Sequence, residues 1–181
     1  ECHRKMMLAI TGHTKGIGKA IADLYPDHIG FSRSIGYDIS VSSHLEKILT
    51  ESQDCDVFIN NAYCGNAQTK VFNMIYELWR NDSNKTIVNI VSRSQYDPHH
   101  HREYSNHKRE LAEYANPGFM YDRKCRIINL SPGWVSSAAV PQAWLEEQDL
   151  PYITADKCAG YVKWALEQDL EIGELSFWKS K

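Results

Sequence analysis

The sequence predicts an α/β fold, with a doubly wound parallel sheet between two layers of helices in one domain. Three observations predict it. Short apolar runs alternate with amphipathic helical segments, which is the pattern of consecutive βαβ units. A glycine-rich turn separates the first apolar run from the first helical segment. The 181 residues suit a single domain, expected to span 1–181 with residues 1–5 as an edge outside the fold.

The first half of the chain predicts alternating strands and helices, except at one point. The stretch 34–39 is too short for a helix, so the second and third strands should be joined by little more than a turn, with the third ending before Asp38. Pro26 ends the first helix. The other expected elements are strands over 6–10, 29–32 and 57–60, and helices over 17–24, 42–52 and 71–79.

The second half continues the alternation. The run 86–91 (TIVNIV) reads as a buried strand, and the next helix, 104–115, ends at Asn116-Pro117-Gly118. The segment 134–151 lacks a clear period and is hypothesised to form a small lid. The remaining expected elements are strands over 126–130 and 172–178 and a helix over 158–166.

Composition excludes several functional classes. The formal net charge of −3 argues against a nucleic-acid partner, which needs a basic surface. No apolar run approaches the roughly 20 residues of a membrane span, and no signal peptide is expected. The five cysteines are scattered without framework spacing, which favours reduced thiols and a cytoplasmic location.

The turn Thr11-Gly12-His13-Thr14-Lys15-Gly16-Ile17-Gly18 has the composition of a phosphate-binding loop. Side chains at its glycines would block the tight turn or keep the backbone away from a pyrophosphate. The helix that follows offers free N–H groups and the positive end of its dipole. Glycines serve many tight turns, so the loop alone is weak evidence for a nucleotide.

Three side chains in the middle of the chain are candidates for catalysis. Tyr104 and Lys108 are four residues apart, so they share one face of a helix. A nearby ammonium favours the phenolate and should lower the pKa of Tyr104, making it a proton donor and acceptor near neutral pH. Ser92 ends the TIVNIV strand, where a hydroxyl can hydrogen-bond a substrate oxygen. Each feature alone occurs by chance on many helices and strand ends.

Taken in order, the motifs resemble those of the short-chain dehydrogenase/reductase family, whose Rossmann-like fold the chain is expected to share from about Leu8 to Trp178. The matching stretches are Thr11–Gly18, Asn60-Asn61-Ala62-Tyr63, Ser92, Tyr104-Ser105-Asn106-His107-Lys108 and Pro132-Gly133-Trp134-Val135-Ser136-Ser137. The resemblance implies an oxidoreductase that interconverts a carbonyl and an alcohol of a small molecule. It also implies a homodimer or homotetramer.

The resemblance assigns a role to each matching residue. Tyr104 would be the general acid and base, Lys108 would bind the nicotinamide ribose, and Ser92 would polarise the substrate oxygen. The other implied cofactor contacts come from the glycine turn (Gly12, Lys15, Gly16, Ile17 and Gly18), from the NNA motif (Asn61 and Ala62) and from the PG motif (Pro132, Gly133, Val135 and Ser137).

The residues that close the second strand decide between NAD and NADP. An Asp there favours NAD, whereas this chain has Ser32-Arg33-Ser34. The Arg33 guanidinium suits a 2′-phosphate, and Lys15 adds a second cation. NADP(H) is therefore favoured over NAD(H), while Asp38 and Ile39 match the position that contacts adenine.

Several features depart from the family pattern. Tyr63 stands where the family has Gly, so its side chain is expected to crowd or reshape the cofactor cleft. Asn66 and Asn73 are both open as the family's further catalytic Asn. His99-His100-His101 lacks supporting ligand spacing, so no metal is expected. Two other readings stay open: a catalytically silent NADP(H)-binding sensor of the same fold, and a flavodoxin-like domain without a dinucleotide.

Overall fold

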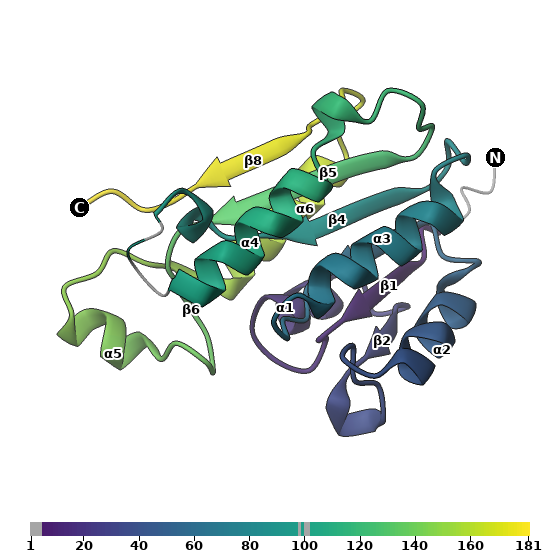
Figure 1. The fold of residues 1–181 in the computed structure, drawn as a ribbon. Helices are drawn as coiled ribbons and strands as arrows, with labels where there is room; N and C mark the ends of the chain where they lie inside the picture. The colour runs from purple at the N-terminus through teal and green to yellow at the C-terminus, as the bar shows by residue number, and fades with distance from the viewer. Residues whose placement is uncertain (1–4, 98, 100–101) are drawn as a thin grey trace.

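A six-stranded parallel sheet forms the middle layer of the protein, in a computed structural model that describes residues 5–97, 99 and 102–181 (Figure 1). The strand order is β2-β1-β3-β4-β5-β8, and every neighbouring pair is parallel. The inner strands are buried on both faces, as their continuous apolar runs require. The strands are β1 (Leu8–Thr11), β2 (Ile29–Phe31), β3 (Val57–Asn60), β4 (Thr86–Ile90), β5 (Arg126–Pro132) and β8 (Glu174–Phe177).

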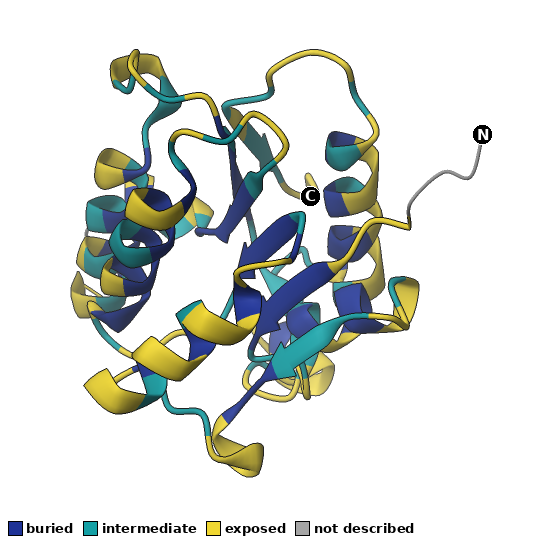
Figure 2. Cartoon of the chain, turned by 90° about the vertical axis from the view of Figure 1, so that its right-hand side faces the viewer, coloured by how far each residue is buried: buried dark blue, intermediate teal, exposed yellow. Residues whose placement is uncertain are grey.

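Helices cover both faces of the sheet, so the predicted three-layer α/β/α architecture is confirmed. One face carries α2 (Ser42–Ser52), α3 (Ala67–Trp79) and α4 (Arg102–Tyr114), and the other carries α1 (Gly16–Leu24) and α6 (Ala155–Leu166). Each helix turns its apolar stripe inward, so the buried residues form two cores, one on each side of the sheet (Figure 2).

The third strand expected before Asp38 does not exist, and that prediction was wrong. After β2 the chain forms a short 3₁₀ helix, η1 (Arg33–Ile35), and enters α2 at Ser42. A parallel strand needs a crossover of a dozen or more residues, which the short stretch between β2 and Asp38 does not provide. The sheet therefore follows the Rossmann order 3-2-1-4-5-6 without strand 3 and with one further strand, β8, beside β5, so that β2 is an edge strand.

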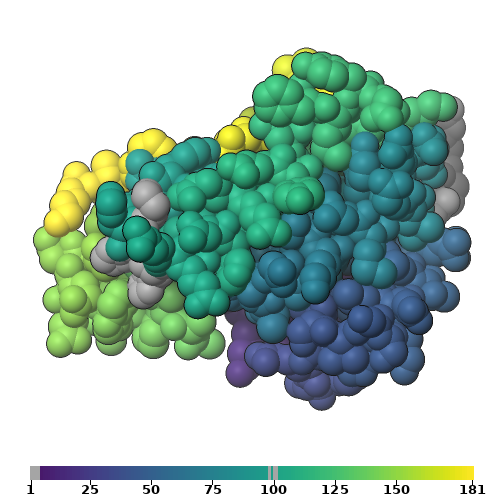
Figure 3. Space-filling view, in the orientation of Figure 1, coloured from purple at the N-terminus to yellow at the C-terminus, as the bar shows by residue number. Residues whose placement is uncertain are grey.

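The segment after β5 contains structure that the sequence did not predict. Strand β6 (Val135–Ser136) pairs in parallel with β7 (Ile153–Thr154), and α5 (Gln142–Glu147) lies between them. Together they form a lobe beyond the carboxyl ends of the main strands, at the left of Figure 3 in yellow-green. Two further 3₁₀ turns are η2 (Arg93–Tyr96) and η3 (Pro117–Phe119).

The connections of the sheet reverse direction at β1. From β1 the chain moves outward to β2 and then returns to β3 on the other side. In open α/β sheets ligands bind beside the carboxyl ends of the strands at such a switch point. Within the described ranges, no helix is long and apolar enough to cross a membrane.

Candidate active site

The glycine-rich turn after β1 is a tight loop in which the backbone of Gly12 lies close to that of Gly18. Gly12 has φ +71°, a left-handed conformation that favours glycine. A Cβ on Gly18 would lie 2.2 Å from the carbonyl oxygen of Gly12, so only glycine fits there. No side chain caps the start of α1. Its first N–H groups, those of Gly16, Ile17 and Gly18, therefore suit an anion.

Asn61 directly follows β3, the neighbour of β1 in the sheet, and holds this turn in place. Its Nδ2 donates to the carbonyl oxygens of Thr11 at 3.1 Å and Gly12 at 3.2 Å. The Thr11 hydroxyl accepts from the backbone N–H groups of Asn61 at 3.0 Å and Ala62 at 3.1 Å. Asn61, expected beside the adenine ribose, thus uses its side-chain amide to fix the shape of the loop.

The loop after β5 also reaches the glycine turn. The Gly133 N–H donates to the Phe177 carbonyl at 2.8 Å, and a Cβ on Gly133 would lie 2.8 Å from that of Trp178. A Cβ on Gly16 would lie 3.5 Å from the Ser137 Cβ. Pro132 ends β5 and Val135 begins β6, so the whole PG motif lies at the carboxyl edge of the sheet.

The two predicted phosphate-binding cations follow neighbouring strands. Thr11 and Phe31 are paired in register at the ends of β1 and β2, so the loops that carry Lys15 and Arg33 begin side by side. Both side chains are exposed, and in the ranges that the structure describes neither forms a salt bridge. The Ser32 hydroxyl lies 2.8 Å from that of Ser34.

The residues expected to contact adenine have a partly different role. Asp38 accepts from the Ser40 N–H at 2.9 Å and from its hydroxyl at 2.7 Å, and these hydrogen bonds lower the pKa of the Asp38 carboxyl. Ile39 is buried in the core under α2 and α3. Its side chain therefore packs the protein interior, so a ligand can meet only its backbone.

Tyr104 and Ser92 meet at the end of β4. Ser92 caps η2, where its hydroxyl accepts from the Ser94 N–H at 3.2 Å. The phenol of Tyr104, in the first turn of α4, is hydrogen-bonded to Ser92. Burial nevertheless raises the pKa of Tyr104, while the Ser92 hydrogen bond lowers it by less. The expected lowering by Lys108 is thus wrong for the protein without ligand, and Tyr104 is a protonated phenol at neutral pH.

Lys108 is the side chain that was expected to lower this pKa, yet its ammonium is buried and turned toward the sheet. Its side chain is 3% exposed, and Nζ donates to Gln68 Oε1 and to the Ile90 carbonyl, both at 2.8 Å. Nζ lies 5.5 Å from the centre of the Tyr104 ring. Burial lowers the pKa of Lys108 from 10.5 to about 7, which weakens the positive charge beside the phenol.

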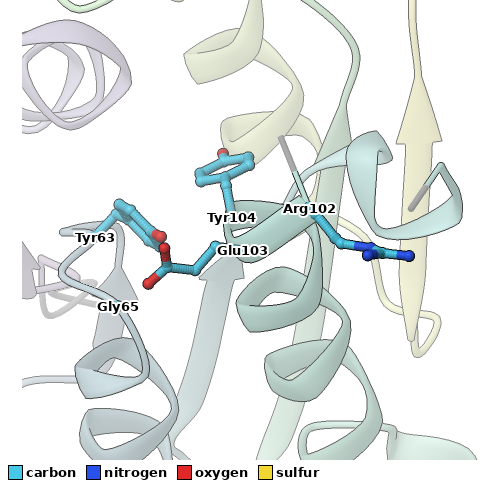
Figure 4. Close-up of a pocket in the computed structure, with 5 residues that line it drawn as sticks. All are labelled: Tyr63, Gly65, Arg102, Glu103 and Tyr104. Carbon is cyan, nitrogen blue, oxygen red and sulfur yellow. The ribbon is translucent and has the colours of Figure 1, made fainter. Parts of the chain in front are cut away.

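Tyr63 covers the space in front of these groups. Its ring lies edge-on to that of Tyr104, with 4.9 Å between centroids, and its hydroxyl lies 3.0 Å from His107 Nδ1. Tyr63 and Tyr104 line a pocket of about 410 Å³ together with Gly65, Arg102 and Glu103. In Figure 4, Glu103 points toward Tyr63, whereas Arg102 points away from the two rings.

Neither asparagine considered for the fourth catalytic position binds Lys108. Asn66 is exposed at the start of α3 and Asn73 is part-buried further along it, whereas the side chain that holds the ammonium is Gln68. Sequence reasoning missed Gln68. The signal was a polar residue three and four positions before Val71 and Phe72, on the apolar stripe of the helix.

The histidine run contributes no metal site to the described structure. His99 is exposed, while His100 and His101 lie outside the described residues. Across residues 5–97, 99 and 102–181, no group of three or more His, Cys, Asp or Glu side chains is placed to hold a metal ion.

No protein-family model and no curated protein sequence matches the chain. Among solved structures, a serine dehydrogenase complexed with NADP+ superposes with TM-score 0.78 at 14% identity, covering 96% of this chain and 95% of that one. A short chain dehydrogenase from Burkholderia cenocepacia complexed with NADP gives 0.74 at 14% identity, with 95% and 96% covered. The chain has the short-chain dehydrogenase/reductase fold.

A solved structure of an archaeal alcohol dehydrogenase is also similar to this chain. The alcohol dehydrogenase from Thermococcus sibiricus, complexed with 5-hydroxy-NADP, superposes with TM-score 0.74 at 17% identity, covering 96% of both chains. At these identities the likeness concerns the fold. The structure of this chain itself places Tyr104 and Lys108 on α4 and Pro132 at the end of β5. The flavodoxin-like alternative would leave Tyr104, Lys108 and the PG motif without an explanation.

Proposed function

We propose that the protein is an NADP(H)-dependent oxidoreductase that interconverts a carbonyl and an alcohol on a small molecule. The observation that carries the proposal is the meeting of Tyr104, hydrogen-bonded to Ser92, with Lys108 one helical turn away. These groups lie at the carboxyl edge of the sheet, where the glycine turn presents uncapped N–H groups.

When bound, the nicotinamide would supply the hydride for the proposed reduction. The Ser92 hydroxyl hydrogen-bonds the carbonyl oxygen and orients it toward Tyr104. The Tyr104 phenol gives its proton to that oxygen as negative charge develops there. Burial raises the pKa of Tyr104 above its ordinary value of 10, so the phenol is protonated at neutral pH and can act as the proton donor.

The residues present fit the proposed cofactor, apart from one obstacle. The glycine turn leaves backbone room and free N–H groups for a pyrophosphate, and Lys15 and Arg33 are exposed beside it. The Lys108 ammonium has three N–H donors, of which two have partners in the described part of the chain. The third is free for a ribose hydroxyl once the Tyr63 ring moves aside.

Two measurements test the proposal. Titration with NADPH, followed by quenching of tryptophan fluorescence, should saturate at a single site. A screen of carbonyl substrates should find NADPH oxidation that Tyr104→Phe reduces by roughly 100- to 10,000-fold while leaving NADPH binding intact. Light scattering of the same samples checks the homodimer or homotetramer that belongs to this proposal. Failure to bind either dinucleotide would overturn the cofactor assignment.

A catalytically silent NADP(H) sensor of the same fold is the second candidate. The observation that favours it is the Tyr63 ring over Lys108, which covers the ammonium that the reaction requires. The sensor and the enzyme differ in one result. A sensor binds NADPH equally well in the wild type and in Tyr104→Phe, and neither protein oxidises it with any carbonyl compound.

A further inference from the structure

The side-chain amide of Gln68 forms hydrogen bonds to backbone carbonyls at the ends of β3 and β4 and to Lys108. Gln68 is 2% exposed, in the first turn of α3. Its Oε1 accepts from Lys108 Nζ at 2.8 Å, and its Nε2 donates to the carbonyl oxygens of Asn60 at 2.8 Å and Ile90 at 3.0 Å. The backbone carbonyl of Gln68 accepts from Asn60 Nδ2 at 3.0 Å. Asn60 therefore fixes both ends of this residue.

A row of buried asparagines extends this network across the sheet. Asn60, Asn89 and Asn129 are paired in register on β3, β4 and β5. Asn60 Nδ2 donates to Asn89 Oδ1, and Asn89 Nδ2 donates to Asn129 Oδ1, both at 2.9 Å. Asn129 Nδ2 closes the row on the Ala115 carbonyl at 2.9 Å. Buried amides are costly to leave unpaired, so this row holds Asn60 in place, and Asn60 binds Gln68 through its Nδ2 and its backbone carbonyl.

We propose that Gln68 is a positioning residue, whose amide oxygen, together with the Ile90 carbonyl, fixes the Lys108 ammonium and leaves one N–H donor for a ligand. A lysine side chain is long and flexible, so without such partners its ammonium would sample many positions. Only the identity of that ligand rests on the proposed function. The geometry of the lysine stands without it.

The partners of the ammonium also control its charge. From α3 and β4 it meets two neutral acceptors, Gln68 Oε1 and the Ile90 carbonyl. Among the described residues, two phenols lie near it, those of Tyr104, on the same helix, and of Tyr63, with ring centres 5.5 and 5.4 Å from Nζ. Burial lowers the pKa of Lys108 to about 7, and the two partners named above carry no negative charge that would offset it. We therefore expect a change of the acceptor at position 68 to change the charged fraction of this amine.

The proposal is tested by titrating Lys108 directly. NMR spectra of ¹³C-lysine-labelled protein, recorded against pH without any ligand, give the midpoint of the Lys108 titration. The Lys108 signal is assigned by its loss in Lys108→Arg. Gln68→Met removes the hydrogen-bond acceptor but keeps a side chain of similar length, so the midpoint of the Lys108 titration should fall by about one pH unit or more. Gln68→Glu supplies a carboxylate, so the midpoint should rise by a similar amount.

A matched control separates positioning from general damage to the network. Asn129→Ala removes a buried amide at the far end of the row, away from Lys108, and should leave the midpoint within about 0.3 pH unit of the wild type. Equal midpoints in the wild type and both Gln68 variants would overturn the proposal, as would an equal shift in Asn129→Ala. Should Gln68→Met fail to fold by circular dichroism, Gln68→Glu decides alone.

Turnover gives a second readout that a merely structural residue would not move. The alkaline limb of kcat/KM for NADPH should shift to lower pH in Gln68→Met and to higher pH in Gln68→Glu. If the wild type binds no NADPH, the proposed function fails, yet the lysine midpoints still decide whether Gln68 positions the ammonium. The two failures are therefore distinguishable.

Discussion

The Lys108 ammonium lies 5.4 Å from the centre of the Tyr63 ring, and Tyr63 lines the pocket together with Tyr104. Two N–H groups of the ammonium are bound by Gln68 and the Ile90 carbonyl. We expect a ligand hydroxyl to reach the third N–H group only after a ring moves. Tyr104 is held by Ser92, whereas Tyr63 is 42% exposed on a loop, so Tyr63 is the ring that moves.

Removal of this ring should therefore strengthen NADPH binding. We expect Tyr63→Gly to lower the NADPH dissociation constant about tenfold. The wild type must break the contact between the Tyr63 ring and the buried ammonium before NADPH binds, at a cost of about 1–2 kcal/mol, and the variant has no such contact to break. Fluorescence titration of the wild type and the variant measures the difference. Tyr63→Phe is the matched control, since it keeps the ring and loses only the contact with His107. Weaker binding in Tyr63→Gly would show that the ring supports the cofactor.

The cofactor preference should depend on Arg33. Arg33→Asp replaces a 2′-phosphate partner with a repelling carboxylate, so NADPH affinity should fall roughly 10- to 100-fold while NADH affinity holds or rises. The ratio of the two dissociation constants measures the change. Lys47→Asp, at an exposed position of α2, is the control for charge alone. Unchanged NADPH affinity in Arg33→Asp would remove Arg33 from the cofactor site.

The order of elements was predictable because the inner strands are buried on both faces. The TIVNIV run is short and rich in β-branched residues, which predicts a buried strand, and glycines at 12, 16 and 18 mark the turn that follows β1. The spacing of Tyr104 and Lys108 likewise placed both on one face of α4. These features are local, so the sequence carries them directly.

The parts that sequence reasoning missed depend on contacts between distant segments. Strands β6 and β7 have two residues each and exist only because they pair with each other. The Lys108 ammonium is hydrogen-bonded to Gln68, forty residues earlier, and the burial of Tyr104 raises the pKa that Lys108 was expected to lower. The expected third strand is absent because the stretch between β2 and Asp38 is too short for a crossover. The family pattern, which includes this strand, led to the wrong prediction.

Two helical glycines should respond in opposite ways to alanine. A Cβ on Gly18 meets the Gly12 carbonyl oxygen at 2.2 Å, so Gly18→Ala should destabilise the protein by about 1–3 kcal/mol and disturb the turn. A Cβ on Gly160, in α6, meets nothing within 4 Å, so Gly160→Ala should stabilise it by about 0.4–1 kcal/mol. Urea denaturation measures both. Equal effects would contradict the close packing of the turn.

The stability of the protein should rise with pH above neutrality because of Lys108. Burial lowers the pKa of Lys108 from 10.5 to about 7 in the folded chain. Above pH 7 the unfolded chain therefore keeps a proton that the folded chain has released, and the penalty for burying the ammonium is relieved as pH rises. From pH 7 to 9 this amounts to about 2–3 kcal/mol of unfolding free energy.

Lys108→Met isolates this contribution, since it has no amine to titrate and shares every other ionisable group with the wild type. The difference in unfolding free energy between the two proteins, from urea denaturation at each pH, should shift in favour of the wild type between pH 7 and 9. It should stay constant below about pH 6, where both states of the wild type are protonated. Lys47→Met, an exposed lysine, controls for loss of a positive charge. Parallel curves for the wild type and Lys108→Met would mean that the ammonium is not buried in solution.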